Sequence, residues 1–509
     1  MHLIGSLIKQ AIHLRKQFSS NPEDINETQC GELCKMLEKA KDTSIGLYYD
    51  FKGILEAEDP QKEFAKRVPI FDYDKMHNAW WHKTLEYPNI TWPGKPDYFA
   101  RSSGTTGDKP KRIPVTDEMV QSIRSVGVEQ LLAIDDFDLP EAFFESQVFM
   151  LGSSTDLIDA GAHKEGEISG ISASNIPTWF ESVYKPGPEI AKIKDWDERV
   201  EAIVKAAPEW NIGAMSGIPS WLNIALKEII KYHNLDTIHD IWPNLSVYTT
   251  GGVAFEPYEP TFKELFGKNV YILDTYLASE GFLAYTNRPN TKSMRLALEH
   301  GIYFEFIPFN ERGFTDTGEL LENPEVLTLS EVKEDQPYAL IITTVSGSYR
   351  YMIGDTITFT DLSNAEIVIS GRTKYWLNVV GSQLSEDKMN HAIKKLEEDL
   401  NLAVEEFTLS AVKDEESGEY YHEWIIGIDG TGPENDKVAA HIDETLKSTN
   451  KNYEVARRKA LKGVKAWLVN SQKFHDWHAR DRKKGGQIKT KKLLKEGEFV
   501  EFKEFMLQA

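Results

Sequence analysis

Residues 101–116 read RSSGTTGDKPKRIPVT and combine the groups that hold a polyphosphate. Glycines let backbone N–H groups approach phosphate oxygens, hydroxyls add donors, and a lysine adds positive charge. The candidate phosphate ligands are Ser102, Ser103, Thr105, Thr106 and Lys111. The segment differs from the usual nucleoside-triphosphatase loop, because Asp108 and not lysine follows Gly107. It predicts a nucleotide-binding loop, although the same residue types also form ordinary solvated turns.

Two further segments contain candidate nucleotide ligands. In YTTGGVAFEPYEP, from residue 248, a strand pattern runs into paired glycines ahead of a helix, where backbone can lie against a base or a phosphate. In DTYLASEGF, from residue 274, a tyrosine could stack on a base and a glutamate could bind magnesium. The candidates are Thr250, Gly251, Gly252, Tyr276, Ser279 and Glu280. Each segment alone is weak, since a glutamate at a strand end is more often simply solvated.

An aspartate and an arginine further along the chain are the candidate ribose ligands. In YRYMIGDTITF, Asp355 follows Gly354, and we expect it between two strands, where a carboxylate accepts hydrogen bonds from both ribose hydroxyls. In ISGRTKYWLNVVGSQLSEDKM, Arg372 lies at an expected domain boundary, from which a guanidinium reaches ribose or phosphate. A hairpin turn and a salt bridge are the ordinary alternatives for these two residues.

The segment RDRKKGGQIKTKKLL, residues 480–494, places seven basic residues beside one acid in an otherwise anionic chain. Two glycines precede Lys489, so this lysine could swing into an active site and neutralise charge on rearranging phosphate oxygens. The alternatives are a solvated basic tail and a nucleic-acid patch, but the segment lacks the interleaved aromatics of the latter.

Composition narrows the class of protein that positions these residues. The chain has 509 residues, 41% of them hydrophobic, and a formal net charge of −22, which fits a multidomain enzyme and disfavours nucleic acid as a partner. No apolar run reaches the length of about 18 residues that spans a bilayer, and no signal-type cleavage site follows the start, so we expect a cytoplasmic protein with no membrane partner. Cys30 and Cys34 are expected to be reduced and structural.

The hydrophobic patterns predict an α/β fold in two domains. The first hundred residues are mainly helical, and strand and helix patterns then alternate. Strand composition occurs in SQVFMLG, NLSVYTT, NVYILDTYLA, IYFEFIPF and YALIITTV, and helical spacing at residues 117–134, 218–233 and 258–266. Beyond residue 371, a helix at 386–400 and the strands EEFTLSAV and YHEWIIGI indicate a smaller α+β domain. We place the boundary between 1–373 and 374–509.

The order of these segments resembles the adenylate-forming superfamily of acyl ligases. The details are most similar to the Gretchen Hagen acyl acid amido synthetases, also called auxin-responsive promoter family proteins. The resemblance spans nearly the whole chain through VPIFDYDKM, SSGTT with KRIPVT, SGIPSW, TTGG, YLASEG, YRYMIGD and GGQIKT. The compact length resembles a bacterial-type member more than a plant one.

The resemblance implies ATP-dependent activation of a carboxylic acid as an acyl adenylate, followed by acyl transfer to an amine, with an amino acid as the expected acceptor. It implies a large amino-terminal domain with β-sheets and surrounding helices, and a small mobile carboxy-terminal domain that rotates about residues 372–374. ATP and Mg²⁺ are the implied cofactors. Lys489, Glu280 and Lys111 would be catalytic, with Glu280 also binding the metal, and Lys489 would stabilise the adenylation transition state. Lys491 and Lys492 stand where many relatives have Pro-Arg.

The implied nucleotide contacts follow the same order along the chain. By the resemblance, the hydroxyl loop with Lys111 would hold phosphates, residues 250–252 would line the adenine, and Tyr276, Ser279 and Glu280 would contact base, phosphate and magnesium. Asp355 and Arg372 would contact ribose and phosphate. SGIPSW, residues 216–221, is the candidate wall of an acyl pocket, although a proline-started helix that packs Trp221 into the core explains it equally well.

Two other functions remain open from the sequence. An acyl-coenzyme A ligase would use the same first half-reaction and differ only in the acceptor. A nucleotide-binding protein without turnover is the other alternative, although the set Lys111, Glu280, Asp355 and Lys489 is intact and argues against it. Neither the acid nor the amine follows from the residues.

Overall fold

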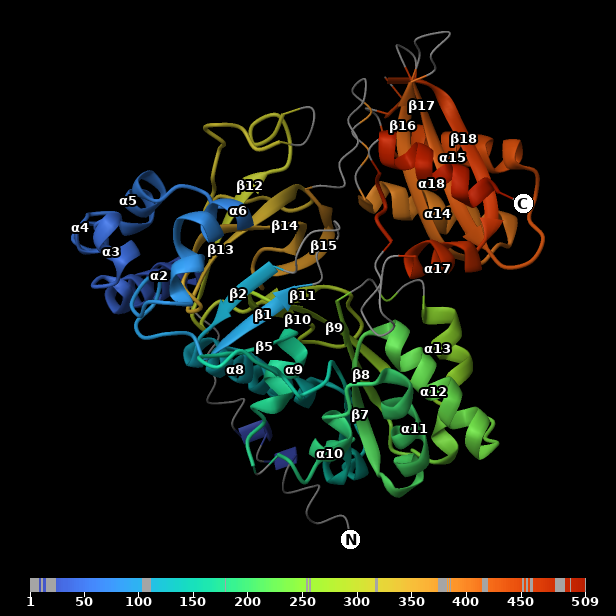
Figure 1. Cartoon of the computed structure of the whole chain (residues 1–509), viewed down its shortest axis with the longest axis horizontal. Helices are drawn as coiled ribbons and strands as arrows, with labels where there is room; N and C mark the ends of the chain where they lie inside the picture. Colours follow the sequence, from blue (N-terminus) through green and yellow to red (C-terminus); the bar gives the residue numbers. More distant parts are fainter. Residues whose placement is uncertain are drawn as a thin grey trace.

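The structure is a computed structural model that consists of a large and a smaller body (Figure 1). It describes residues 9–10, 12–14, 24–102, 111–178, 180–252, 255, 258–315, 319–373, 382, 384, 386–413, 420–450, 453–454, 456–457, 461–480, 490–494 and 496–508. The smaller body begins at α14 (Glu386–Leu400). The predicted boundary after residue 373 falls beside residues outside this description, so it stays a prediction.

A helical layer formed by residues 25–84 covers one end of the large body. Its elements are α2 (Ile25–Ala40), α3 (Ser44–Tyr48), α4 (Phe51–Leu55), α5 (Pro60–Arg67), α6 (Tyr73–Met76), the π-helix η1 (His77–Trp81) and α7 (His82–Thr84). Aspartates at the N-caps of α2, α5 and α6 accept hydrogen bonds from first-turn N–H groups, which explains where these helices begin. Gln29 of α2 bonds to the backbone of residues 298, 302 and 304, and so covers the open edge of the main sheet.

The main sheet has eleven strands in the order β12-β13-β14-β15-β11-β10-β9-β8-β7-β3-β6. The five strands from β9 to β6 in this order run parallel to one another. The other neighbouring strands pair antiparallel. The strands are β3 (Gln147–Leu151), β6 (Tyr184–Lys185), β7 (Ile212–Gly217), β8 (Val247–Gly251), β9 (Tyr271–Ala278), β10 (Gly281–Tyr285), β11 (Met294–Leu296), β12 (Ile302–Pro308), β13 (Pro337–Thr344), β14 (Ser348–Asp361) and β15 (Glu366–Arg372). Parallel strands expose their carboxyl ends on one edge, where α/β proteins place ligands.

Further helices of the large body pack around its sheets. They are α8 (Asp117–Ala133), α9 (Ile168–Ser174), α10 (Pro188–Ala191), α11 (Trp196–Ala206), α12 (Pro219–His233) and α13 (Glu259–Leu265), with the short 3₁₀ turns η2 (Ile134–Asp136), η3 (Glu141–Glu145), η4 (Ala207–Glu209) and η5 (Ile238–Asp240). α11, α12 and α13 lie together beside β7 and β8 in Figure 1, and their apolar faces form one core with β3, β7 and β8. The buried positions of α12 recur as Leu222, Leu226 and Ile229, which is the helical period that the sequence showed.

A second sheet, in the order β2-β1-β5-β4, carries the hydroxyl-rich loop. Its strands are β1 (Tyr98–Ser102), β2 (Lys111–Val115), β4 (Ile158–Asp159) and β5 (Lys164–Gly166). β1 and β2 pair antiparallel, so the predicted loop joins two strands of a hairpin.

The smaller body is an α+β unit, as predicted. It contains α14 (Glu386–Leu400), β16 (Val404–Lys413), β17 (Tyr420–Ile428), α15 (Asn435–Thr449), β18 (Leu461–Asn470), α17 (Gln472–Ala479) and α18 (Glu496–Leu507). Its three strands are ordered β16-β17-β18, with α14 and α15 packed on one face and α17 and α18 on the other.

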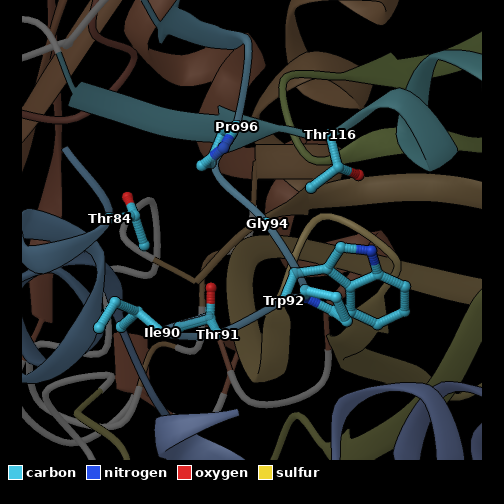
Figure 2. Close-up of a pocket in the computed structure, with 8 residues that line it drawn as sticks. Thr84, Ile90, Thr91, Trp92, Gly94, Pro96 and Thr116 are labelled. Atoms are coloured by element: carbon cyan, nitrogen blue, oxygen red, sulfur yellow. The ribbon is translucent and has the colours of Figure 1, made fainter. Parts of the chain in front are cut away.

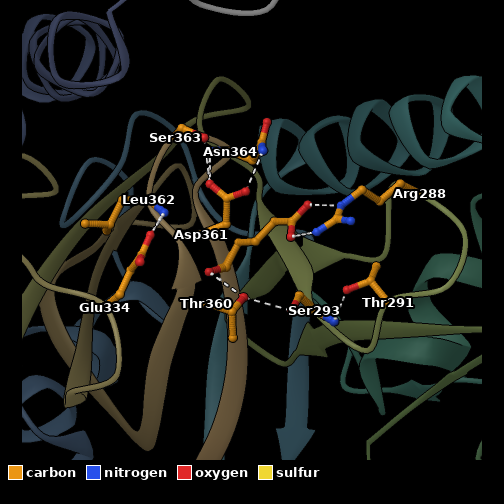
Figure 3. Close-up of polar contacts among 10 residues, drawn as sticks. Arg288, Thr291, Ser293, Glu334, Thr360, Asp361, Leu362, Ser363 and Asn364 are labelled. Carbon is orange, nitrogen blue, oxygen red and sulfur yellow. Dashed lines mark hydrogen bonds and ion pairs between the residues drawn. The ribbon is translucent and has the colours of Figure 1, made fainter.

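The predicted strands and helices are present, with one local difference. The sequence indicated that Asp355 lies between two strands, but β14 continues through it from Ser348 to Asp361. Gly354 has a φ of +93° and the pairing of β14 shifts register nearby, so a glycine irregularity inside one strand imitates a turn in the sequence. Figure 3 shows where β14 ends and β15 begins, away from Asp355. There Arg288 donates two hydrogen bonds to Glu366 of β15.

Two further expectations concern the part of the chain that the structure describes. No helix there is long and apolar enough to cross a membrane. Cys30 and Cys34 are both free thiols, as expected, and burial raises the pKa of Cys34 to about 11.

Candidate active site

The β1–β2 hairpin positions the predicted phosphate loop. Ser102, the last residue of β1, lies directly opposite Lys111, the first residue of β2. The loop therefore leaves and re-enters the sheet at one point, and its lysine is held at the mouth of the loop. Ser103, Thr105 and Thr106 lie outside the described residues.

Side chains distant in sequence fix this hairpin. Glu165 of β5 is 4% exposed, and its Oε1 forms an ion pair with Arg112 Nε at 2.9 Å. The hydroxyl of Tyr73 accepts a hydrogen bond of 2.9 Å from the backbone N–H of Arg112, while the Lys111 ammonium lies 5.0 Å from the centre of the Tyr73 ring. A cation over an aromatic face is attracted to it, so the tyrosine ring orients the lysine.

Paired glycines lie at the end of β8, where Gly251 pairs with Thr275 of β9. A side chain at Gly251 would place a Cβ only 2.6 Å from Thr275 Oγ1, so only glycine fits. The same threonine hydroxyl donates a hydrogen bond of 2.8 Å to the carbonyl of Thr250. Gly252 follows at once, and the backbone of residues 250–252 is thereby fixed at the carboxyl end of a parallel strand.

Asp355 joins two of the predicted ligands directly. Its Oδ2 accepts a hydrogen bond of 2.6 Å from the Tyr276 hydroxyl, and its Oδ1 accepts one of 2.8 Å from Arg372 Nε. Asp355 and Arg372 are opposite each other in the β14–β15 register. Burial and then the nearby carboxylate raise the pKa of Tyr276 well above its usual value, so its hydroxyl stays protonated and donates.

Glu280 lies beside this cluster in the two-residue turn that it forms with Ser279 between β9 and β10. Glu280 is buried, with only 7% of its surface exposed. Burial raises the pKa of Glu280 to about 7, the positive charge of Lys111 opposes the increase, and Asp355 adds to it. An unneutralised buried carboxylate is costly, so this site favours a cation.

The residues fit a magnesium ion held largely by its nucleotide. Mg²⁺ prefers oxygen ligands and is usually bound by one or two carboxylates together with substrate phosphates. Within the described ranges, no group of three or more His, Cys, Asp and Glu side chains could hold a metal by itself. The single carboxylate of Glu280 beside Lys111 therefore suits a metal–phosphate complex better than a protein-only metal cage.

Several residues of this cluster were missed by the sequence reasoning. Tyr351 lies 2% exposed on β14, and its hydroxyl interacts with the carboxyl of Glu280. A signal existed, because Tyr351 precedes Asp355 by four residues in the same motif and residues at even spacing share a face in a regular strand. Tyr73 and Glu165 offered no comparable signal, since each lies far from residues 101–116 in the chain.

SGIPSW connects β7 to α12 beside the paired glycines. Ser216 of β7 pairs with Thr249 of β8, and Pro219 takes the first position of α12. Trp221 is half-buried against the core formed with α11, and its ring centre lies 5.2 Å from that of Trp196. The helix-start interpretation is therefore correct, and the segment also lies at the ligand edge of the sheet.

The hollow shown in Figure 2 lies apart from this cluster. Its lining includes Thr84, Ile90, Trp92 and Thr116 and none of the predicted site residues. Lys111 begins β2 and Thr116 directly follows its last residue. Along an extended strand, these two residues are about 17 Å apart.

The chain after Lys489 is anchored to the smaller body, whereas Lys489 itself lies outside the described residues. Leu409 of β16 donates its N–H to the carbonyl of Lys492 at 2.9 Å and accepts from the N–H of Leu494 at 3.0 Å. Lys492 also pairs with Glu406 at 3.5 Å. Lys491 and Lys492 thus belong to a segment that extends the edge of the β16-β17-β18 sheet.

Three family models match this chain consecutively. The GH3 family N-terminal domain matches residues 14–141 and 159–271, the central domain matches 295–371, and the C-terminal domain matches 387–498. The chain belongs to the GH3 family. The resemblance drawn from the motifs is confirmed.

Relatives in the GH3 family share limited identity with it. "Indole-3-acetic acid-amido synthetase GH3.2" of Arabidopsis thaliana is 27% identical over 236 residues, 43% of this chain and 43% of that protein. "Probable indole-3-acetic acid-amido synthetase GH3.11" of Oryza sativa subsp. japonica is 28% identical over 232 residues, 44% of this chain and 34% of the relative. These matches thus span less than half of each relative.

Solved structures show that the GH3 fold extends over nearly the whole chain. The structure titled "AtGH3.15 acyl acid amido synthetase in complex with 2,4-DB" matches with a TM-score of 0.75 and 18% identity, and covers 98% of this chain and 96% of that chain. A 2-hydroxyisobutyryl-CoA ligase in the postadenylation state matches with a TM-score of 0.57 and 10% identity, over 94% of this chain and 92% of that one. The predicted α/β fold is confirmed.

Proposed function

We propose that this GH3 protein activates a carboxylic acid with ATP as an acyl adenylate and transfers the acyl group to an amine, with an amino acid as the acceptor. The observation that carries the proposal is the convergence of Lys111, Glu280 and the Tyr276–Asp355–Arg372 cluster at one end of the sheet. The names of the GH3 relatives, which are acid-amido synthetases, support the same reaction.

The nucleotide would lie across the carboxyl ends of β8 and β9 and the middle of β14, where Asp355 lies. Ser102, Ser103, Thr105, Thr106 and Lys111 would bind its phosphates, and residues 250–252 would line the adenine. Tyr276 and Arg372 hold Asp355 with both carboxylate oxygens oriented, which prepares this carboxylate to accept hydrogen bonds from ribose hydroxyls. A carboxylate held from two sides loses little further freedom on binding.

Glu280 would bind magnesium, and Ser279 would contact phosphate in the same turn. The metal supplies charge neutralisation to the phosphate oxygens. Within the protein, Lys111 contributes positive charge from the hairpin, and Tyr73 keeps this charge at the mouth of the loop. Lys489 would add positive charge at the transferring phosphorus during adenylation.

The first half-reaction forms a bond between a carboxylate oxygen of the acid and the α-phosphorus of ATP, and pyrophosphate leaves. In the second, the amine nitrogen forms a bond to the acyl carbon, AMP leaves with the C–O bonding electrons, and the nitrogen loses a proton. The contribution of the protein is mainly positioning and electrostatic stabilisation, because the adenylate already provides a good leaving group.

The experiment measures pyrophosphate release from ATP and magnesium with a panel of aryl and alkyl acids, with and without mixed amino acids. We expect release that requires an acid, an amide product that requires an amino acid, and loss of both in Lys489→Ala. Lys491→Ala is the matched control, because this lysine lies in the same segment and pairs with Glu498 on the protein surface.

The acceptor separates this proposal from an acyl-coenzyme A ligase, whose fold is also similar. A thioester formed with coenzyme A and no amide would contradict the proposal. Binding of ATP without pyrophosphate release across the panel would instead favour a nucleotide-binding protein without turnover. Cytoplasmic location and the lack of a nucleic-acid partner stay predictions from composition.

A further inference from the structure

Arg199 of α11 is a buried cation with no counterion in contact. It is 5% exposed, and its Nε is sequestered without a hydrogen-bond partner. Among the described residues, none makes a hydrogen bond or an ion pair with its guanidinium, whose close neighbour is the ring of Trp196 at 5.3 Å. Buried charges in proteins are normally paired and hydrogen-bonded, because desolvation of an isolated ion costs several kcal/mol.

The acidic groups around Arg199 do not neutralise it. Glu167 exerts an electrostatic attraction on it from beyond ion-pair distance, and the carboxylate of Glu167 already accepts a hydrogen bond from the Ser153 hydroxyl. Tyr184 is the other neighbour, but burial raises its pKa to about 12, so it is neutral at physiological pH. Burial lowers the pKa of Arg199 itself, yet a guanidinium remains charged in proteins.

Arg199 lies along the ligand edge of the sheet, away from the nucleotide cluster. Its neighbour Trp196 contacts Trp221 at the start of α12, directly after β7. Ser153, which bonds to Glu167, follows the end of β3. Glu280 follows β9, and the order β9-β8-β7-β3 puts three strand spacings, roughly 14 Å, between the two ends of this edge.

We propose that Arg199 binds a second carboxylate at the far end of the acyl substrate, so that the preferred acids are dicarboxylic acids. This inference rests on the proposed function. The planar guanidinium matches a carboxylate in a bidentate pair. The partly buried rings of Trp196 and Trp221 would lie beside the carbon chain between the two carboxylates.

The distance decides against the acceptor as the source of this carboxylate. The α-carboxylate of an amino acid is separated from its amine by a single carbon, and the amine must reach the acyl carbon beside the α-phosphate. That carboxylate must therefore stay near Glu280 and Lys111. A partner for Arg199 has to extend from the reaction centre toward β3, as the distal end of a long acid does.

The test compares acids of equal length that differ only in the distal group, such as octanoate and suberate, in the pyrophosphate-release assay. We expect the wild-type enzyme to prefer the diacid by about tenfold or more in kcat/KM, since charge-assisted bidentate bonds are strong. Arg199→Met keeps an apolar stem and should reduce this preference at least tenfold, mainly through KM. Arg312→Met is the control, because Arg312 pairs with Glu325 on the surface and its loss should leave the preference intact.

A binding measurement separates this inference from the proposed reaction. Suberate should raise the melting temperature of the wild-type protein without ATP, and this increase should disappear in Arg199→Met. If no acid supports pyrophosphate release, the reaction is refuted, while an Arg199-dependent thermal shift still supports the carboxylate site. If the enzyme releases pyrophosphate with equal preference for both acids and Arg199→Met changes neither, the site is refuted and the reaction stands.

Two other results would also overturn the assignment. A variant that raises KM for the amino acid but not for the diacid would assign the carboxylate to the acceptor; the amide of the same amino acid, which has no carboxylate, would then be insensitive to Arg199→Met. The second result concerns stability. If Arg199→Met sharply lowers the melting temperature at every pH, and Arg199→Lys restores the melting temperature but not the preference for the diacid, then the arginine is a structural residue.

Discussion

Replacing Glu280 with glutamine should remove activity and yet stabilise the empty protein. Burial raises the pKa of this carboxyl from an ordinary value of 4.5 to about 7. The folded state thus favours the protonated form, so the stability that this group contributes is present below pH 4.5 and is lost as the pH rises through 7. The full difference corresponds to roughly 3 kcal/mol at pH 8.

Glu280→Gln resembles the protonated side chain at every pH, so it should recover this free energy. For a cooperative unit the size of the amino-terminal body, roughly 3 kcal/mol raises the melting temperature by about 4 °C at pH 8. At pH 5 the gain should shrink to under about 1 kcal/mol, because the group is then mostly protonated in the folded state. The assay is calorimetry or thermal-shift fluorescence of the empty protein across this pH range, with pyrophosphate release measured in parallel.

Glu305→Gln is the matched contrast, since Glu305 is also a buried carboxyl whose pKa burial raises. It differs because it pairs with the buried Arg350 at 3.0 Å. Its replacement leaves that cation without its counterion, which should destabilise the fold by roughly 3–5 kcal/mol at either pH. Our reasoning is refuted if Glu280→Gln lowers the melting temperature at pH 8, or if its gain does not depend on pH.

Three further outcomes follow from contacts in and outside the site. Tyr276→Phe removes the 2.6 Å hydrogen bond to Asp355 and should weaken ATP binding about tenfold, measured by calorimetric titration; unchanged affinity would mean that Arg372 alone orients the carboxylate. Tyr73→Leu removes the ring that contacts the Lys111 ammonium and should raise the KM for ATP by a factor of about 2 to 5. If Tyr73→Leu raises the KM equally in a protein that already carries Lys111→Met, the ring does not act through Lys111. Burial lowers the pKa of His422 to about 3, so the stability of the smaller body should fall as the pH drops below about 6.5. His422→Phe should flatten this decline in acid unfolding followed by circular dichroism, and an unchanged acid midpoint would exclude His422 as its cause.

The secondary structure was predictable because it depends on short-range patterns. Apolar residues in YALIITTV and the helical spacing at 218–233 correspond to β13 and α12 nearly to the residue. The position of Asp355 was wrong because Gly354 adopts a positive φ inside a continuous strand, and a glycine before an acid looks the same in a turn.

The sequence predicted the residues of the candidate site only where they belong to motifs. Tyr73 lies in the quoted segment VPIFDYDKM, but its contact with Lys111 was not predicted, because the two residues are far apart in the chain. Arg199 stayed unnoticed because its burial without a counterion depends on distant segments. A polar residue in a helix pattern is normally exposed, and nothing local reveals that Arg199 is not.

By itself, the sequence determined the order and type of the elements, the family, and which residues have the chemistry to bind a nucleotide. These properties are local, because periodicity and motif spacing are set by residues close together in the chain. Only the tertiary structure decided that Tyr276 and Asp355, 79 residues apart, share a hydrogen bond, and that Glu280 and Arg199 are buried. Burial and pairing depend on which distant segments fold together, and so the pKa of Glu280 and the unmatched charge of Arg199 exist only in the folded chain.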